Sequence, residues 1–283
     1  MKCFETDLNE HQVNSYLQRI SNYLMMNGGF IHNPGLFSGE MGLALFFARY
    51  AVIKQNDLYS EYSFELIEIV QNSIHQGTTI DYQYGLTGIG SAIEYLSKFK
   101  YVKSDTDDIL EEFDDRIIYD DQITQFSIDK LLGIGYYTLW RIAGGSNKTD
   151  MILEKTLPTL VRLINEMNTG LDRKYQIIEF LKELTRNHFS SDCERREALQ
   201  HVCSQWLVSS CRNRNDVFRG FFEKYLELIK KNDLFDNKAL DLGLQNGLAG
   251  FGMALMTELD GDDSWISLLP NDLIQLKNEP LPL

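Results

Sequence analysis

A glycine motif that recurs along the chain constrains the fold more than any other feature of the sequence. Its four copies are "GEMGLALFF" from Gly39, "GLTGIGSAI" from Gly85, "KLLGIGYYT" from Lys130 and "GLAGFGMAL" from Gly247. The copies share G-x-x-G, an apolar residue and then Gly or Ala, except that Lys130 replaces the first glycine of the third copy. Self-similarity of this kind indicates a repeat architecture.

The second glycines of the motif define the period. Gly42, Gly88 and Gly133 lie 46 and then 45 residues apart, and Gly250 follows after a further 117 residues. The last interval has room for two periods, so we expect one degenerate copy near residues 175–210 that has lost its glycines. A period of about 45 residues that holds two helices is typical of an array of helical hairpins.

Apolar residues after each motif follow a helical spacing. Leu43, Phe46, Phe47 and Tyr50 fall at i, i+3, i+4 and i+7, and the stretches between motifs alternate apolar and charged faces, as helices with one wet side do. The chain of 283 residues is 43% hydrophobic and has only five prolines, against a usual share of about 5%. We therefore predict one all-α domain over residues 1–283.

The glycines could hold a phosphate or allow two backbones to approach each other. A dinucleotide-binding loop needs G-x-G-x-x-G after a strand, whereas this chain repeats G-x-x-G-x-G without strand-like alternation before it. Because glycine costs a helix up to about 1 kcal/mol relative to alanine, four copies indicate a compensating gain. We expect that gain to come from close packing.

Charge and hydropathy exclude several classes of partner. The formal net charge is −14, which disfavours nucleic acids and acidic membranes and favours basic or neutral ligands. No apolar stretch of about 18 residues is present, so we expect no membrane span. Four cysteines are too few for a disulfide framework, which favours a cytoplasmic location.

Five segments carry a resemblance to a known family: "SGEMGLALFF", "YGLTGIGSAIEYL", "LLGIGYYTL", "QNGLAGFGMALM" and the closing "DDSWISLLP". They resemble the repeats of the lanthionine synthetase C-like (LanC-like) family of lanthipeptide cyclases, over a span from Gly35 to about Pro270. The resemblance implies an α/α toroid, a barrel of helical hairpins in which the glycine motifs start the inner helices. Fewer repeats are recognisable here than in the family.

The chemistry of that family depends on zinc, which two cysteines and one histidine hold and which activates a peptide cysteine for addition to a dehydrated residue. This chain contains no adjacent Cys–His pair, and its four motifs contain no cysteine. We therefore expect no metal centre and no cofactor. The resemblance then implies a peptide-binding or scaffolding component of a peptide-modification system, with a divergent active cyclase as the alternative.

Two other groups of residues have the composition of a metal site. Cys193, His201, Cys203 and Cys211 supply zinc-type ligands, but His201 and Cys203 should lie on opposite sides of a helix. The acidic segment "DDILEEFDD" from Asp107 could hold magnesium, although its charged surroundings favour an exposed helix start.

A carbohydrate-active α/α toroid is a further alternative, because such enzymes need two opposed carboxylates. Glu40 and Glu94 are the candidates, and we expect them at equivalent ends of two inner helices.

For the peptide-binding hypothesis, the residues just before and within the motifs should gather at one rim of the barrel. Loops at such a rim are a usual place for function. We predict a peptide or protein partner there, bound by His32, Glu40, Tyr82, Tyr84, Gln245 and Asn246.

Overall fold

Paired helices make up the described part of the chain. The computed structural model describes residues 7–103, 105–166, 170–187, 193–205, 222–223, 225–228 and 240–270, and these ranges contain helices and no strand. The predicted all-α class is therefore confirmed. The helices are α1 (Glu10–Asn27), α2 (Glu40–Lys54), α3 (Asp57–Ser73), α4 (Leu86–Lys98), α5 (Thr106–Ile118), α6 (Ile128–Gly144), α7 (Thr149–Asn165), α8 (Leu171–Asn187), α9 (Cys193–Gln205) and α11 (Leu248–Asp260), with short 3-10 helices η1 (Gly28–Phe30), η2 (Ile123–Gln125) and η3 (Ser264–Leu268).

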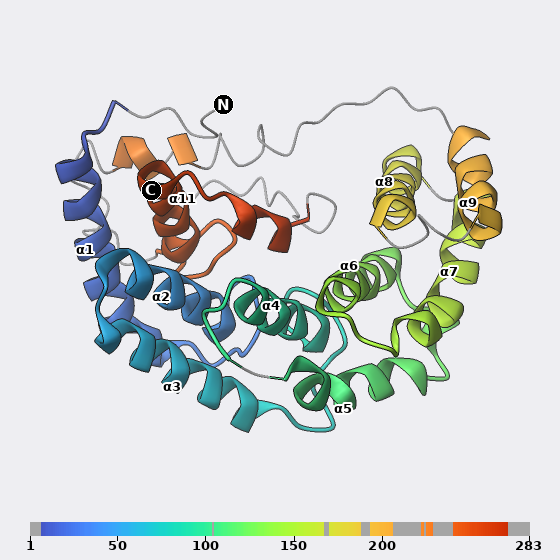
Figure 1. The fold of residues 1–283 in the computed structure, drawn as a ribbon, viewed down its shortest axis with the longest axis horizontal. Helices are drawn as coiled ribbons and strands as arrows, with labels where there is room; N and C mark the ends of the chain where they lie inside the picture. Colours follow the sequence, from blue (N-terminus) through green and yellow to red (C-terminus); the bar gives the residue numbers. More distant parts are fainter. Residues whose placement is uncertain are drawn as a thin grey trace.

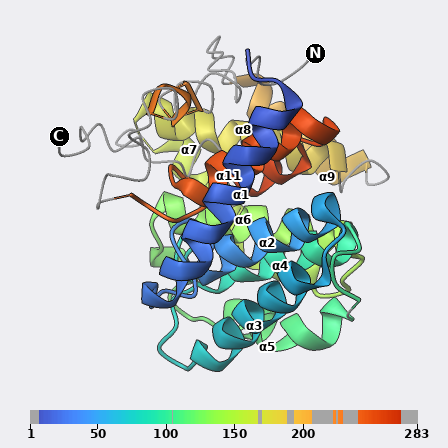
Figure 2. The same cartoon turned by 90° about the vertical axis from the view of Figure 1, so that its left-hand side faces the viewer.

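The helices form an inner and an outer row. α11, α2, α4, α6 and α8 contact one another in that order, and α1, α3, α5, α7 and α9 pack on them from outside (Figures 1 and 2). Each inner helix except α11 is followed in the chain by its outer partner, as a hairpin array requires. One of the stretches between motifs that we expect to be helical, "VFRGFFEKYLELIKK" from Val217, falls mostly outside the described residues.

Three inner helices start in the same way, directly after the first glycine of the motif. Gly39, Gly85 and Gly247 are the N-cap residues of α2, α4 and α11, each in an extended conformation. The third motif differs, because α6 begins at Ile128, ahead of Lys130, and the side chain of Ser127 caps it. Lys130 can replace the first glycine of this motif because it lies within α6 and is not the N-cap residue.

Two inner helices, α2 and α4, are buried on all sides along most of their length. Every residue from Glu40 to Ala51 of α2 is buried, as is every residue from Leu86 to Leu96 of α4. Helices that are apolar all round belong in an interior, and α2 and α4 have helices on both flanks as well as an outer partner. The outer helices α3 and α5 bury only one side.

Helix α8 occupies the place of the expected degenerate copy. A Cβ on Gly90 of α4 would lie 2.5 Å from the Tyr137 ring of α6, and one on Gly135 of α6 would lie 2.5 Å from the Phe180 ring of α8. The Phe46 ring of α2 packs on Gly252 of α11 in the same manner. The shared ring-on-glycine contact identifies α8 as an inner helix, although its own sequence has no glycine motif.

Candidate functional site

The loops that precede α11, α2 and α4 are joined into one surface by backbone hydrogen bonds. The Gln245 amide donates to the Phe37 carbonyl at 3.0 Å, and the Phe37 amide donates to the Gln83 carbonyl at 3.1 Å. All three residues stand five positions before the second glycine of their motif. We call the surface formed by residues 32–40, 79–86 and 241–248 the motif rim.

Glycines make this loop-to-loop packing possible. A Cβ on Gly35 would lie 2.6 Å from the Gln83 carbonyl oxygen, and a Cβ on Gly243 would lie 2.6 Å from Ser38 Cα. Side chains at these positions would therefore separate the loops.

The motif glycines allow each loop to cross its own helix. A Cβ on Gly42 would lie 2.5 Å from the Leu36 carbonyl oxygen, and Gly88 and Gly250 approach the equivalent carbonyls of Tyr82 and Leu244 even more closely. The prediction that the glycines serve close packing is confirmed.

The six residues predicted for binding lie in the motif rim but differ in exposure. His32, Tyr84 and Asn246 are exposed, Gln245 is half-buried, and Glu40 and Tyr82 are buried. Tyr82 is only 2% exposed; its ring contacts those of Phe37 and Tyr136, and its Cβ faces Gly133. Tyr82 therefore packs beneath the surface of the rim and supports it from the interior.

The exposed residues are held on a rigid loop surface. The Asp81 carboxylate accepts a hydrogen bond from the Tyr84 amide at 2.7 Å. The Tyr225 hydroxyl donates to the Asn246 carbonyl at 3.0 Å, and Asn246 has a positive φ of 59°. Tyr84 and Asn246 occupy the same position of their motifs, four residues before the second glycine. They therefore present polar side chains from the two loops that lie on either side of the α2 loop.

Gln245 and Glu40 place polar side-chain groups in the rim to which no described residue bonds. The side-chain nitrogen Nε2 of Gln245 is buried and has no acceptor among the described residues. The Glu40 side chain is 8% exposed and accepts no side-chain hydrogen bond; burial raises the pKa of its carboxyl, and the charge of His32 partly opposes that rise. An unsatisfied buried group in a native fold calls for a specific explanation, such as a missing ligand.

Glu40 and Glu94 do not lie at equivalent ends of their helices, which corrects the sequence-based expectation. Glu40 is the first residue of α2, whereas Glu94 lies in the second half of α4. The reason is positional: Glu40 precedes the second glycine of its motif by two residues, and Glu94 follows its own by six. The carbohydrate-enzyme alternative therefore loses its pair of opposed carboxylates.

Glu94 instead belongs to a buried network that the sequence did not reveal. Arg141 on α6 bonds Glu94 at 2.5 Å and Asp114 on α5 at 2.7 Å, and all three side chains are at most 2% exposed. Tyr137 donates to Asp114 at 2.6 Å. An arginine inside the apolar stretch "YYTLWRIAG" was the available signal. Because every acceptor is turned toward one cation, the network serves to hold α4, α5 and α6 together.

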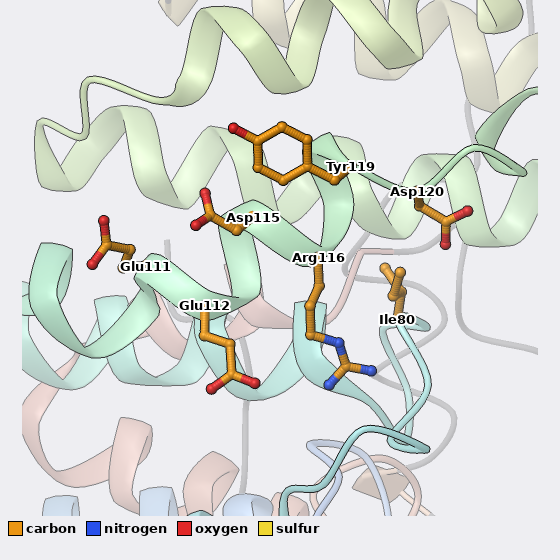
Figure 3. Close-up of a pocket in the computed structure, with 7 residues that line it drawn as sticks. All are labelled: Ile80, Glu111, Glu112, Asp115, Arg116, Tyr119 and Asp120. Atoms are coloured by element: carbon orange, nitrogen blue, oxygen red, sulfur yellow. The ribbon is translucent and has the colours of Figure 1, made fainter.

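An acidic groove of about 560 Å³ lies on the outer helix α5. Figure 3 shows that the Glu112 carboxylate points away from those of Glu111 and Asp115. Arg116 donates to three backbone carbonyls of residues 75–78, and Lys148 pairs with Glu111 and Asp115. Glu111 and Asp115 thus share one lysine while Glu112 lies apart, and among the described residues the three carboxylates form no group that could hold a metal ion. The "DDILEEFDD" segment lies on an outer helix as its charge indicated, although its Asp114 is buried.

The cysteine cluster is divided by its helix. In α9, His201 is exposed while Cys203 is buried, and burial raises the pKa of the Cys203 thiol. The two residues thus lie on different sides, as predicted, and Cys211 is outside the described residues. Within the described ranges, no group of three potential metal-ligating side chains gathers.

No family model, curated protein or solved structure matches the chain. None of the described helices has the length and apolarity that crossing a membrane requires. The geometry of the motif rim is therefore the basis for a functional assignment.

Proposed function

We propose that this chain is a LanC-like peptide-binding protein. In this proposal the two rows of helices close into an α/α toroid, and the motif rim holds an extended peptide. The role of the protein would be that of a binding or scaffolding component in a peptide-modification system, without a zinc centre. The proposal includes a peptide or a peptide-modification protein as partner.

One observation carries the proposal: the side-chain nitrogen Nε2 of Gln245 is buried within the rim and has no acceptor among the residues that the structure describes. Leaving such a donor unsatisfied costs about 1–3 kcal/mol. A peptide laid across the rim would offer carbonyl oxygens to it. The backbone bonds from Gln245 to Phe37 and on to Gln83 run across three repeats, so they define a direction along which an extended chain could lie.

The neighbouring side chains suit a peptide. Tyr84 is 47% exposed and offers a ring and a hydroxyl on a loop that Asp81 holds in place. Aromatic side chains of this kind supply contact area at low entropic cost. Asn246, exposed at the equivalent position of the α11 loop on the other side of the α2 loop, adds an amide that can pair with a peptide group.

A binding assay with matched variants tests the proposal. The probes are short fluorescent peptides of basic, neutral and acidic composition, and the readout is fluorescence anisotropy with the full chain. The variants are Tyr84→Ala, Gln245→Met, which keeps the volume and removes the donor, and Asn246→Gly, which keeps the left-handed backbone conformation.

We expect each variant to weaken binding about tenfold, which corresponds to ~1.4 kcal/mol. Tyr119→Ala is the matched control, because Tyr119 is 71% exposed but lies on the acidic groove of α5. Binding that survives all three rim changes but is lost in Tyr119→Ala would move the site to α5. Failure of every peptide to bind would refute the proposal.

A further inference from the structure

Glu40 occupies a position that the other repeats fill with leucine. Two residues before the second glycine stand Glu40, Leu86, Leu131 and Leu248 in the four motifs. The three leucines are fully buried, and Glu40 is 8% exposed. The fold therefore offers an apolar niche at this position, and only the first repeat places a carboxylate in it. A residue that opposes its local environment in this way is characteristic of a functional position.

Among the described residues, no cation is hydrogen-bonded to the Glu40 carboxylate. No described residue donates a hydrogen bond to its side chain. Its oxygens are not fully enclosed by the protein, so they remain in contact with solvent. His32, exposed in the loop that leads to α2, is the nearby group whose charge attracts it, and Tyr62 of α3 is also close enough to sense its charge. Burying a carboxylate without a hydrogen-bonded cation is costly, so a ligand that supplies the cation would recover that cost.

We infer that Glu40 is the anchor for a hydrogen-bond-donating cation of the rim-bound peptide, either a lysine or arginine side chain or an N-terminal ammonium group. This inference rests on the proposed peptide binding and specifies its substrate class. A guanidinium or ammonium group would donate to the Glu40 carboxylate in the niche, with His32 at its edge. The net charge of −14 adds long-range attraction for a basic peptide.

The test uses four short peptides that differ in one group. The first has blocked ends and a central lysine, the second carries the same lysine acetylated, the third has a central arginine, and the fourth has no basic side chain and a free N-terminus. Affinities are measured by calorimetry for the full-length chain and for Glu40→Gln, Glu40→Leu and Tyr84→Ala. Glu112→Gln, on exposed α5, removes the same charge elsewhere and serves as the control.

We expect Glu40→Gln to weaken binding of at least one cationic peptide by about tenfold or more, while Glu112→Gln leaves it within about twofold. Acetylation of the lysine should have the same effect as Glu40→Gln. Comparison of the first, third and fourth peptides then identifies the source of the cation. Glu40→Leu should abolish binding and raise the melting temperature by about 2–4 °C, because leucine suits the niche.

Other results would overturn the inference. Equal affinity for the lysine and acetyl-lysine peptides would show that Glu40 does not anchor a cation. Equal losses of affinity in Glu40→Gln and Glu112→Gln would show the same. Binding that falls in Tyr84→Ala but not in Glu40→Gln would leave peptide binding at the rim intact and refute only the role of Glu40. Binding that depends on neither residue would refute both proposals.

Discussion

Single glycines decide how closely the repeats approach. The would-be Cβ of Gly42 meets the Leu36 carbonyl of its own loop and, at 3.0 Å, Leu244 Cβ of the neighbouring loop. Gly88 repeats this arrangement with Tyr82 of its own loop and Leu36 of the loop before it. The energetic cost of glycine in a first helical turn is thus offset by contacts between consecutive repeats.

We predict that Gly88→Val and Gly250→Val each lower the free energy of unfolding by about 1–3 kcal/mol, as overpacking generally does. The reason is that both side chains would collide with a backbone carbonyl, which cannot rotate away. Urea unfolding monitored by circular dichroism measures the change. Gly29→Ala is the control, because nothing lies within 4 Å of a Cβ there. Unchanged stability in both valine variants would contradict the packing role.

At the scale of helices, a buried charge network fixes α4, α5 and α6 against one another. Arg141 contacts carboxylates from two other helices, and it also donates to Ser146 at 2.9 Å beyond the end of its own helix. Burial raises the pKa of Glu94, and its bond to Arg141 acts in the opposite direction. Removing the arginine would leave Glu94 and Asp114 buried without a cation.

We predict that Arg141→Met destabilises the fold by about 3–5 kcal/mol, the range for a buried ion pair that loses one partner. The comparison variant is Arg162→Ala, which breaks an exposed pair with Glu166 within one helix and should cost at most about 0.5 kcal/mol. Both are measured by urea unfolding at neutral pH. Equal effects of the two substitutions would show that the network contributes no more than a surface pair.

At the scale of the whole molecule, the segment around η3 ties distant repeats together. The Trp265 indole is fully buried and donates to Thr257 of α11 at 3.0 Å. Arg49 of α2 pairs with Asp260 at 2.7 Å, and the Tyr95 hydroxyl of α4 lies 3.0 Å from the Ser264 hydroxyl. The last described helix is thereby fastened to the first two repeats.

We predict that Trp265→Ala costs about 3–5 kcal/mol, as truncation of a buried aromatic side chain does, and that the whole chain still unfolds in one transition. Phe30→Ala, at a side chain that is 77% exposed, should change stability by no more than about 0.5 kcal/mol. Near- and far-ultraviolet circular dichroism during urea unfolding should give the same midpoint. A separate early transition in Trp265→Ala would contradict the coupling of the repeats.

The sequence by itself determined the features that depend on local pattern. The 46- and 45-residue recurrence of Gly42, Gly88 and Gly133 predicted hairpins of helices, and apolar spacing predicted where α2 and α4 run. Helical periodicity and glycine at a helix start are properties of short segments, so they can be recognised without knowledge of the partners.

Tertiary structure decided the features that depend on which segments meet. Glu94 faces Arg141 although 47 residues separate them, and the Phe180 ring fills the space at Gly135 in a repeat without a motif. Burial of Tyr82, and of a Gln245 Nε2 that finds no acceptor within the described ranges, likewise follow from contacts between loops of different repeats. Local periodicity specifies that a helix forms, but the partner of a charge or a ring is selected by long-range packing, which no short segment contains.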